Sequence, residues 1–212
     1  VFMQYESLVV MPQYTPPLQI GLRYTTSRSK FLNDMQVRPL QIRTEHVPVG
    51  FQYTDGSVPT GFSIALQKAV SKGEIRLQSD DPTEHPILDY HYLSAPYDLE
   101  RMRESVRLCA ELTSRDEFAG IVKRFSPNDE ILLNDDALSN WILSNVSTQH
   151  HSSGTCKMGP VSDLMSVVDP YCKVHGLDNL MVVDASVMPD VVRANTNATT
   201  IMIAEKIADQ IM

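Results

Sequence analysis

The feature that most constrains the fold of this chain is a change of hydrophobic period near residue 93. Before that point, apolar and polar residues alternate in short runs separated by polar turns. Alternation puts the apolar side chains on one face of a strand, and strands that follow one another without helices between them favour an antiparallel sheet. We therefore predict strands over residues 8–11, 19–25, 35–43, 60–67, 74–78 and 86–92.

After residue 93 the apolar residues recur at helical spacing. One helix is predicted to start at residues 94–96, because Ser94 suits a cap and Pro96 suits the first turn. A second is predicted to start at Asn134, with Leu138, Trp141, Ile142 and Val146 on one face. Helices packed on one face of a mostly antiparallel sheet make an α+β fold.

The last third of the chain has a different pattern. Residues 150–159 form a polar stretch without periodicity, whereas residues 179–184 are nearly all apolar, which predicts a strand covered on both faces. Residues 198–212 read as a helix that is apolar almost all round, and such a helix requires deep burial. We expect this strand and helix to belong to a sheet whose other strands lie outside the chain.

Composition and charge exclude several classes of protein. The 212 residues carry 18 Lys and Arg against 26 Asp and Glu, a net charge of −8, which disfavours binding to nucleic acids or to anionic membranes. No apolar run is long enough to cross a bilayer. Three cysteines without a C-x-x-C motif fit a reducing compartment, so we expect a cytoplasmic location. There are only nine glycines, and neither G-x-G-x-x-G nor G-x-x-x-x-G-K-[ST] occurs.

The polar stretch at 150–159 contains two adjacent histidines, His150 and His151. A histidine can exchange protons near pH 7, so either could act as a general base on an alcohol, although a structural role remains an alternative. A metal site with Cys156 lacks a fourth ligand at motif spacing. A nucleophilic serine in residues 152–154 lacks the G-x-S-x-G pattern.

A second polar stretch, residues 184–200, joins the predicted apolar strand to the apolar helix. Asn195, Thr196 and Asn197 come just before that helix, where unpaired backbone N–H groups favour a ligand with partial negative charge. Capping of the helix by Asn197 is the structural alternative, and it is compatible with ligand binding.

Three segments together resemble the glucose–methanol–choline (GMC) family of flavin oxidoreductases. Residues 148–159 resemble its H-x-x-G-T-x-x-M-G segment, and residues 167–189 resemble its V-D-x-x-x-x-V-x-G-x-x-x-L-x-V-x-D-A-S-x-x-P stretch. Residues 195–200 resemble its N-P-N-x-x-T ending, with Thr196 in place of the proline. Residues 72–98 are similar to part of the family's substrate domain, and the choline-dehydrogenase-like branch is the most similar.

The resemblance implies a chemistry and a set of site residues. His151 falls where the family has the base that takes the substrate's hydroxyl proton while a hydride passes to N5 of FAD. Asn195 falls at the second catalytic position, which would hold the hydroxyl oxygen. The implied cofactor-binding residues are His150, Asp184, Ala185, Thr196, Asn197 and Thr200, and no metal is implied.

The resemblance also implies a division of the chain. Residues 1–147 would form the substrate-binding domain, and residues 148–212 would form the active-site loop and the C-terminal part of the FAD-binding domain. The glycine-rich loop that holds the FAD diphosphate is missing, so we expect an N-terminal FAD-binding part as partner, from the same gene or a second chain. The substrate would be a small-molecule alcohol. Two alternatives stay open: a non-catalytic α+β module that binds a partner, and a lyase with the GMC fold.

Overall fold

The computed structural model describes residues 2–7, 20–41, 58–118 and 122–211. They belong to two compact units. The first unit comprises residues 1–66 and 92–147, and the second comprises residues 67–91 and 148–212. Residues 67–91 therefore group with the C-terminal part of the chain. The last boundary between the two units lies between residues 147 and 148, where the final third of the chain begins.

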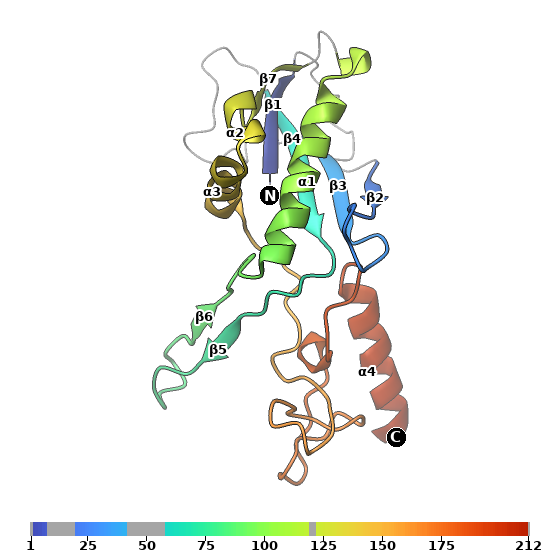
Figure 1. Ribbon diagram of the computed structural model, residues 1–212. Coiled ribbons are helices and arrows are strands. Elements are labelled where there is room, and N and C mark those ends of the chain that lie inside the picture. Colours follow the sequence, from blue (N-terminus) through green and yellow to red (C-terminus); the bar gives the residue numbers. More distant parts are fainter. Residues whose placement is uncertain (1, 8–19, 42–57, 119–121, 212) are drawn as a thin grey trace. The chain divides into compact units, whose positions relative to one another are not determined.

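The first unit is built on a five-stranded antiparallel sheet (Figure 1). In spatial order its strands are β2 (Leu22–Tyr24), β3 (Met35–Gln41), β4 (Val58–Leu66), β1 (Phe2–Ser7) and β7 (Val122–Ser126). The predictions for 19–25, 35–43 and 60–67 are confirmed, with somewhat different ends, while the predicted strand at 8–11 lies outside the described residues. Alternation did not identify β1 and β7, which pair with each other inside this sheet.

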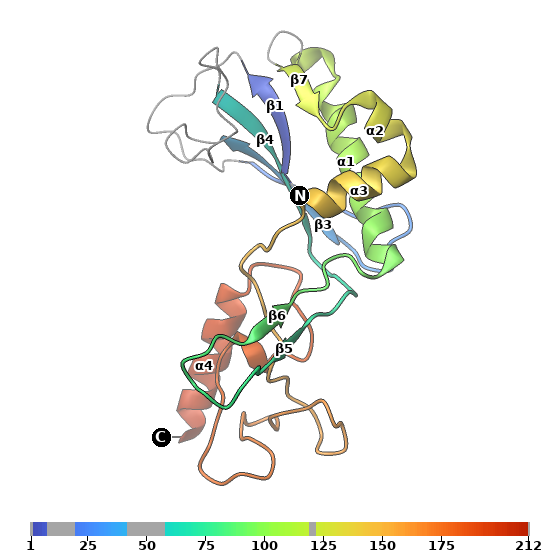
Figure 2. The ribbon, with the colours of Figure 1, turned by 90° about the vertical axis from the view of Figure 1, so that its left-hand side faces the viewer.

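Three helices of the first unit lie on the same face of the sheet (Figure 2). They are α1 (Pro96–Thr113), α2 (Asp129–Leu133) and α3 (Asp135–Asn145), and a short 3-10 turn, η2 (Asp116–Phe118), follows α1. The core between the helices and the sheet is apolar and completely or almost completely buried; it includes Met35, Val37, Phe62, Ile64, Met102, Val106, Cys109, Leu138 and Ile142. This arrangement confirms the predicted α+β fold.

The predicted N-caps can be compared with the observed ones at the starts of α3 and α1. Asn134 caps α3 as predicted, because its side-chain oxygen accepts the N–H groups of Asp136 and Ala137. The expected cap of α1 by Ser94 is wrong: Ala95 occupies the cap position and makes no side-chain bond, and Pro96 begins the helix. Proline at the first position costs no hydrogen bond, because that N–H has no partner inside a helix.

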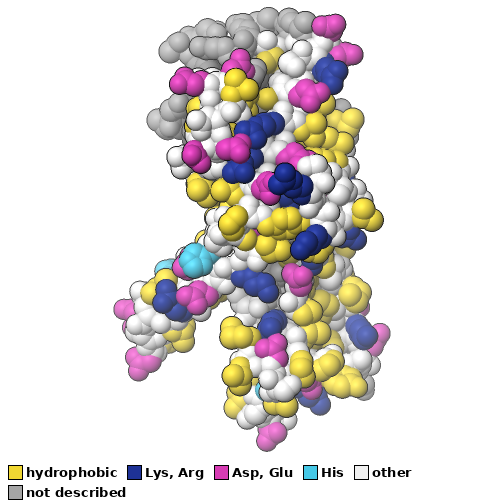
Figure 3. Space-filling model, in the orientation of Figure 1, with side chains coloured by type: hydrophobic (Ala, Val, Ile, Leu, Met, Phe, Trp, Pro, Cys, Tyr) yellow, Lys and Arg dark blue, Asp and Glu magenta, His cyan; other side chains and the backbone are white. Residues whose placement is uncertain are grey.

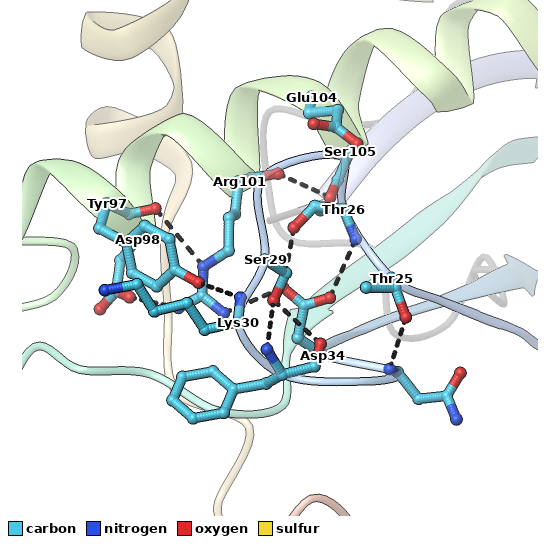
Figure 4. A network of polar contacts seen from close by, with 12 residues as sticks. Thr25, Thr26, Ser29, Lys30, Asp34, Tyr97, Asp98, Arg101, Glu104 and Ser105 are labelled. Atoms are coloured by element: carbon cyan, nitrogen blue, oxygen red, sulfur yellow. Dashed lines mark hydrogen bonds and ion pairs between the residues drawn. The ribbon is translucent and has the colours of Figure 1, made fainter.

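A buried ion cluster ties α1 to the loop between β2 and β3 (Figure 4). The guanidinium of Arg101 lies 3.0 Å from Asp34 Oδ2 and 2.5 Å from Asp98 Oδ1, and all three side chains are at most 1% exposed. The ring of Tyr97 stacks 4.2 Å from the guanidinium carbon, and Thr26 donates its N–H and its hydroxyl to Asp34. Such a cluster is tolerated in a core only because every charge has close partners.

The second unit contains little regular structure. It has a two-stranded hairpin, β5 (Glu74–Arg76) paired with β6 (Ile87–Asp89), a 3-10 turn, η3 (Ala185–Val187), and one long helix, α4 (Asn197–Ile211). The strands predicted at 74–78 and 86–92 form over three residues each. The helix predicted over 198–212 is confirmed as α4, which begins one residue earlier, and residue 212 lies outside the described residues.

The strand predicted over residues 179–184 is wrong. Only Met181 makes a β-bridge, to Lys173, next to two bonds that join the flanking backbone at 180 and 182 to residues 174 and 172. The backbone of residues 180–182 therefore pairs on one side only, with the irregular segment 172–174. A longer strand needs a continuous partner for its backbone groups, and no such partner is present among the described residues.

Helix α4 is much less buried than its composition predicts. Ile207 is its one buried residue among those described, whereas Ile201, Met202 and Ile211 are each more than half exposed. Figure 3 shows hydrophobic side chains at the surface in the region of α4. The deep burial that its apolar composition calls for is therefore not provided by the described part of the chain. No helix in the described part of the chain has the length and hydrophobicity needed to cross a membrane.

Candidate active site

The site is built on two stretches of the second unit that lie side by side. The backbone N–H groups of Gly154, Cys156 and Met158 donate to the carbonyl oxygens of residues 185, 186 and 187, over 3.4, 3.0 and 2.8 Å. This ladder joins the two segments that carry the family motifs. It fixes the position of residues 150–153, which come just before it.

Gly154 is required by this close packing. Its φ is +83°, and a Cβ atom at this position would lie 3.2 Å from the carbonyl oxygen of Met188. Any other residue would be strained by the positive φ and would crowd the backbone of the facing segment. The positive φ and the close packing therefore explain why the H-x-x-G-T pattern has glycine at this position.

A small core beneath this ladder holds α4 in place. Its buried members are Val168, Cys172, Val187 and Ile207, and Met158 and Ile203 pack against them. Ile207 belongs to α4 and Val187 to η3, so the core connects the helix to the ladder.

The structure brings His151 together with the start of α4. His151 Nε2 lies 2.8 Å from Asn195 Nδ2, and His151 Nδ1 lies 3.1 Å from Thr196 Oγ1. His151 is partly buried, Asn195 is exposed and Thr196 is only 7% exposed. The two predicted catalytic residues are thus neighbours, although 44 positions separate them. Their catalytic roles remain predictions.

Thr196 contacts both His151 and the first turn of α4, and its implied role in binding the cofactor stays a prediction. Its hydroxyl faces the imidazole of His151, and its carbonyl oxygen accepts the N–H and the hydroxyl of Thr200, each over 2.9 Å. The side chains of both threonines are therefore engaged within the chain. Thr196, and not Asn197, is the residue that precedes α4, so the alternative in which Asn197 caps the helix is wrong.

The first turn of α4 offers hydrogen-bond donors. Asn197 is exposed, and among the described residues neither its backbone N–H nor that of Ala198 has a partner, as is usual for the start of a helix. The helix dipole adds partial positive charge there. These groups suit a ligand that presents hydrogen-bond acceptors.

The remaining predicted cofactor residues lie on the two joined segments. Asp184 is exposed and caps η3 by accepting the N–H of Ser186, 2.8 Å away. The Ala185 carbonyl accepts the N–H groups of Gly154 and Met188. His150 is exposed, with φ of +60°, and its imidazole makes no hydrogen bond in the described part of the chain.

An ion pair that no sequence pattern predicted joins Lys68 to the segment that leads to Asn195. Lys68 Nζ lies 2.5 Å from Asp190 Oδ2 and donates to the carbonyl of Val191, 2.9 Å away. A separation of 122 positions leaves no local signal for this contact. The described residues contain no cluster of three or more His, Cys, Asp or Glu side chains that could hold a metal.

Comparison with known proteins decides the family. The family model described as GMC oxidoreductase matches residues 69–204, well over half of the chain. The chain belongs to the GMC oxidoreductase family. The resemblance found in the sequence is thereby confirmed, and with it the assignment to the C-terminal region of a family whose members bind FAD.

Individual relatives agree with this assignment. The GMC chain is 38% identical over 177 residues to an oxygen-dependent choline dehydrogenase of Escherichia coli O139:H28, an alignment that covers 80% of this chain and 31% of that protein. Among solved structures, a pyridoxine 4-oxidase from Mesorbium loti matches with a TM-score of 0.82 and 25% identity, over 99% of this chain and 42% of that one.

A formate oxidase of Aspergillus oryzae RIB40, studied for the modification of its FAD, matches with a TM-score of 0.73 and 25% identity, over 84% of this chain and 31% of that one. The chain therefore spans about a third of the length of the curated relatives that it matches.

Proposed function

We propose that this chain forms the C-terminal part of an FAD-dependent oxidoreductase that oxidises the CH–OH group of a small alcohol. The observation that carries the proposal is the pairing of His151 with Asn195 at 2.8 Å. Membership of the GMC family supports redox chemistry, and a base beside a hydrogen-bond donor is what removal of a hydroxyl proton needs.

In this proposal, FAD supplies the acceptor for the hydride that leaves the substrate carbon. His151 takes the hydroxyl proton with its Nε2 lone pair, the atom that faces Asn195. When the substrate binds, its hydroxyl replaces the direct contact between Nε2 and the Asn195 amide, and Asn195 donates its N–H to the hydroxyl oxygen and so aligns the C–H bond that breaks. The positive charge left on His151 then stabilises negative charge in its neighbourhood.

The residues present fit a flavin. Its pyrimidine ring carries carbonyl acceptors, and the start of α4 presents unpaired N–H groups and the exposed amide of Asn197 next to the His151 pair. We propose that Thr196, Asn197 and Thr200 lie against that ring, with the backbone N–H groups of Asn197 and Ala198 as the donors to its carbonyl oxygens. Asp184, Ala185 and His150 would contact other parts of the cofactor, as the resemblance implies.

We further propose that the exposed apolar face of α4 docks against the N-terminal FAD-binding part of the same enzyme. Ile201, Met202 and Ile211 are 54%, 53% and 64% exposed, and burial of each would stabilise that contact. Residues 1–147 would then shape the substrate pocket and residues 148–212 would complete the flavin site. The three cysteines, all free, support a reducing compartment such as the cytoplasm.

The test is anaerobic reduction of FAD in the enzyme that contains this chain, followed by bleaching of the flavin absorbance. The first substrates to try are choline and pyridoxine, because the choline dehydrogenase and the pyridoxine 4-oxidase to which the chain is similar are named for them. His151→Gln should lower the rate of flavin reduction about 100-fold or more while FAD stays bound. His85→Gln is the matched control, because His85 is an exposed residue between β5 and β6.

Three other outcomes of this experiment would contradict the proposed function, each in a different way. A near-normal reduction rate in His151→Gln would refute the role of His151 as base. A flavin that binds but is not reduced by any alcohol would favour a lyase with the GMC fold. A chain that never forms a flavin site with its counterpart would favour a non-catalytic partner-binding module.

A further inference from the structure

The imidazole of His151 has a neighbour at each of its two ring nitrogens. Nε2 lies 2.8 Å from Asn195 Nδ2, and Nδ1 lies 3.1 Å from Thr196 Oγ1. An amide NH₂ group donates hydrogen bonds and accepts none, so Nε2 is the acceptor in this pair. The hydrogen of the neutral ring is then on Nδ1, from which it is donated to the Thr196 hydroxyl oxygen.

The position of Thr196 is fixed independently of the histidine. Its carbonyl oxygen accepts both the N–H and the hydroxyl of Thr200, so its backbone is part of the first turn of α4. Its side chain is almost fully buried, and a buried hydroxyl without a partner would be costly. The Thr196 oxygen is therefore a fixed acceptor rather than a mobile one.

This contact depends on a departure from the family pattern. The segment resembles N-P-N-x-x-T, with Thr196 where the pattern has proline. Proline has no hydroxyl, so its side chain could not accept a hydrogen bond from the imidazole. Threonine at this place therefore gives His151 a partner that the pattern itself does not supply.

We propose that Thr196 is a positioning residue that holds His151 in the tautomer with hydrogen on Nδ1 and an unprotonated Nε2, the nitrogen that accepts from the Asn195 amide in this structure. The inference rests on the proposed function of His151 as base. In the reaction, the Nε2 electron pair forms an N–H bond as the hydroxyl O–H bond breaks, and the electron pair of that bond stays on the substrate oxygen. Nδ1 keeps its hydrogen throughout, so the contact with Thr196 persists in both states of the ring.

The tautomer can be measured directly, without activity. In the ¹⁵N-labelled enzyme that contains this chain, the imidazole resonances of His151 are identified as those lost in His151→Gln. The wild type should show a protonated Nδ1 and an unprotonated Nε2 at a pH where the ring is neutral. Thr196→Val should shift the tautomer ratio about threefold to tenfold toward hydrogen on Nε2, the effect of one lost hydrogen bond.

Two further variants make the test specific. Thr196→Ser keeps the hydroxyl and should keep the wild-type tautomer. Thr199→Val is the matched control, because Thr199 lies in the same helical turn and its hydroxyl makes no hydrogen bond in the described part of the chain. Thr196→Ala replaces Thr196→Val if the valine variant loses its dispersed spectrum.

A wild-type chain with hydrogen on Nε2 would overturn the proposal, whatever the variants do. So would an unchanged tautomer in a folded Thr196→Val chain. In the complete enzyme, Thr196→Val should lower kcat for flavin reduction more than it changes KM, and Thr196→Ser should restore it. If the tautomer is as proposed but His151→Gln still reduces flavin normally, the proposed function fails while the structural role of Thr196 stands.

Discussion

Replacing Arg101 by methionine removes the positive charge between two buried carboxylates in the first unit. Asp34 and Asp98 are fully buried, and the Arg101 nitrogens lie 3.0 and 2.5 Å from their oxygens. Methionine keeps much of the apolar stem, so the change is mainly electrostatic. We expect Arg101→Met to lose about 3–5 kcal/mol of unfolding free energy at pH 7, the usual result of leaving a buried charge without its partner.

The pH dependence of this loss tests its cause. Burial by itself would raise the pKa of Asp34, but hydrogen bonds from Ser29, Thr26 and Arg101 outweigh that effect and hold this pKa below its usual range. A lowered folded-state pKa stabilises the protein above the unfolded pKa of about 3.9, and that stabilisation is lost as the pH falls through the folded value. Without Arg101, Asp34 should take up its proton at a higher pH. The difference between wild type and variant should therefore shrink as the pH falls from 7 to 4.

The assay is urea unfolding followed by the fluorescence of Trp141, the single tryptophan of the chain. Trp141 lies on α3 and packs against the core of the first unit, so its signal reports on that unit. Arg115→Met is the control, because the Arg115–Glu111 pair is more than 60% exposed on both sides and such pairs contribute at most about 1 kcal/mol. Equal losses in the two variants, or a loss for Arg101→Met that does not change between pH 7 and 4, would refute the reasoning.

Two further predictions concern the helix cap and the cysteines. Asn134→Ala should lower the unfolding free energy by about 0.5–2 kcal/mol in the same urea titration, because Asn134 accepts two backbone N–H groups of α3; an unchanged midpoint would contradict this. Cys109 and Cys172 are completely buried, and burial raises the pKa of the Cys109 thiol to about 12, whereas Cys156 is partly exposed. A disulfide reagent at pH 8 should therefore find one fast-reacting thiol in the folded chain and three in urea, and two fast thiols in the folded chain would count against the described core.

The first unit shows where sequence reasoning succeeds. Alternation over 35–43 and 60–67 predicts β3 and β4 because a half-buried strand exposes every second side chain, a constraint that acts on neighbouring residues. The same holds for α3, whose start follows from Asn134 and whose buried positions Leu138 and Ile142 recur at helical spacing. In contrast, α2 has only five residues, too few for a period to be recognised.

The buried ion cluster of the first unit could not be predicted from local sequence patterns. Arg101 meets Asp98 three positions away on α1, a spacing that a helix brings together. Its second partner, Asp34, is 67 positions away in a loop. Charged residues are usually exposed, so no local pattern indicates that these three are buried together.

The second unit depends still more on long-range contacts. The apolar run at 179–184 predicted a strand, but its backbone pairs over only three residues with an irregular segment. Hydrophobicity alone reports that a segment is buried and not which backbone lies beside it. Likewise, composition predicted α4 correctly as a helix, but within this chain Ile207 is the one buried side chain found among its described residues.

By itself, the sequence determined the α+β class, the family, and the residue types from which a base and a hydrogen-bond donor can be made. Motifs and periods carry this information because they are local. The tertiary structure alone decided that His151 meets Asn195 through Nε2 and Thr196 through Nδ1, across 44 and 45 positions. Those contacts are set by the ladder at Gly154 and by the core beneath α4, and a hydrogen bond depends on tenths of an ångström that no sequence pattern specifies.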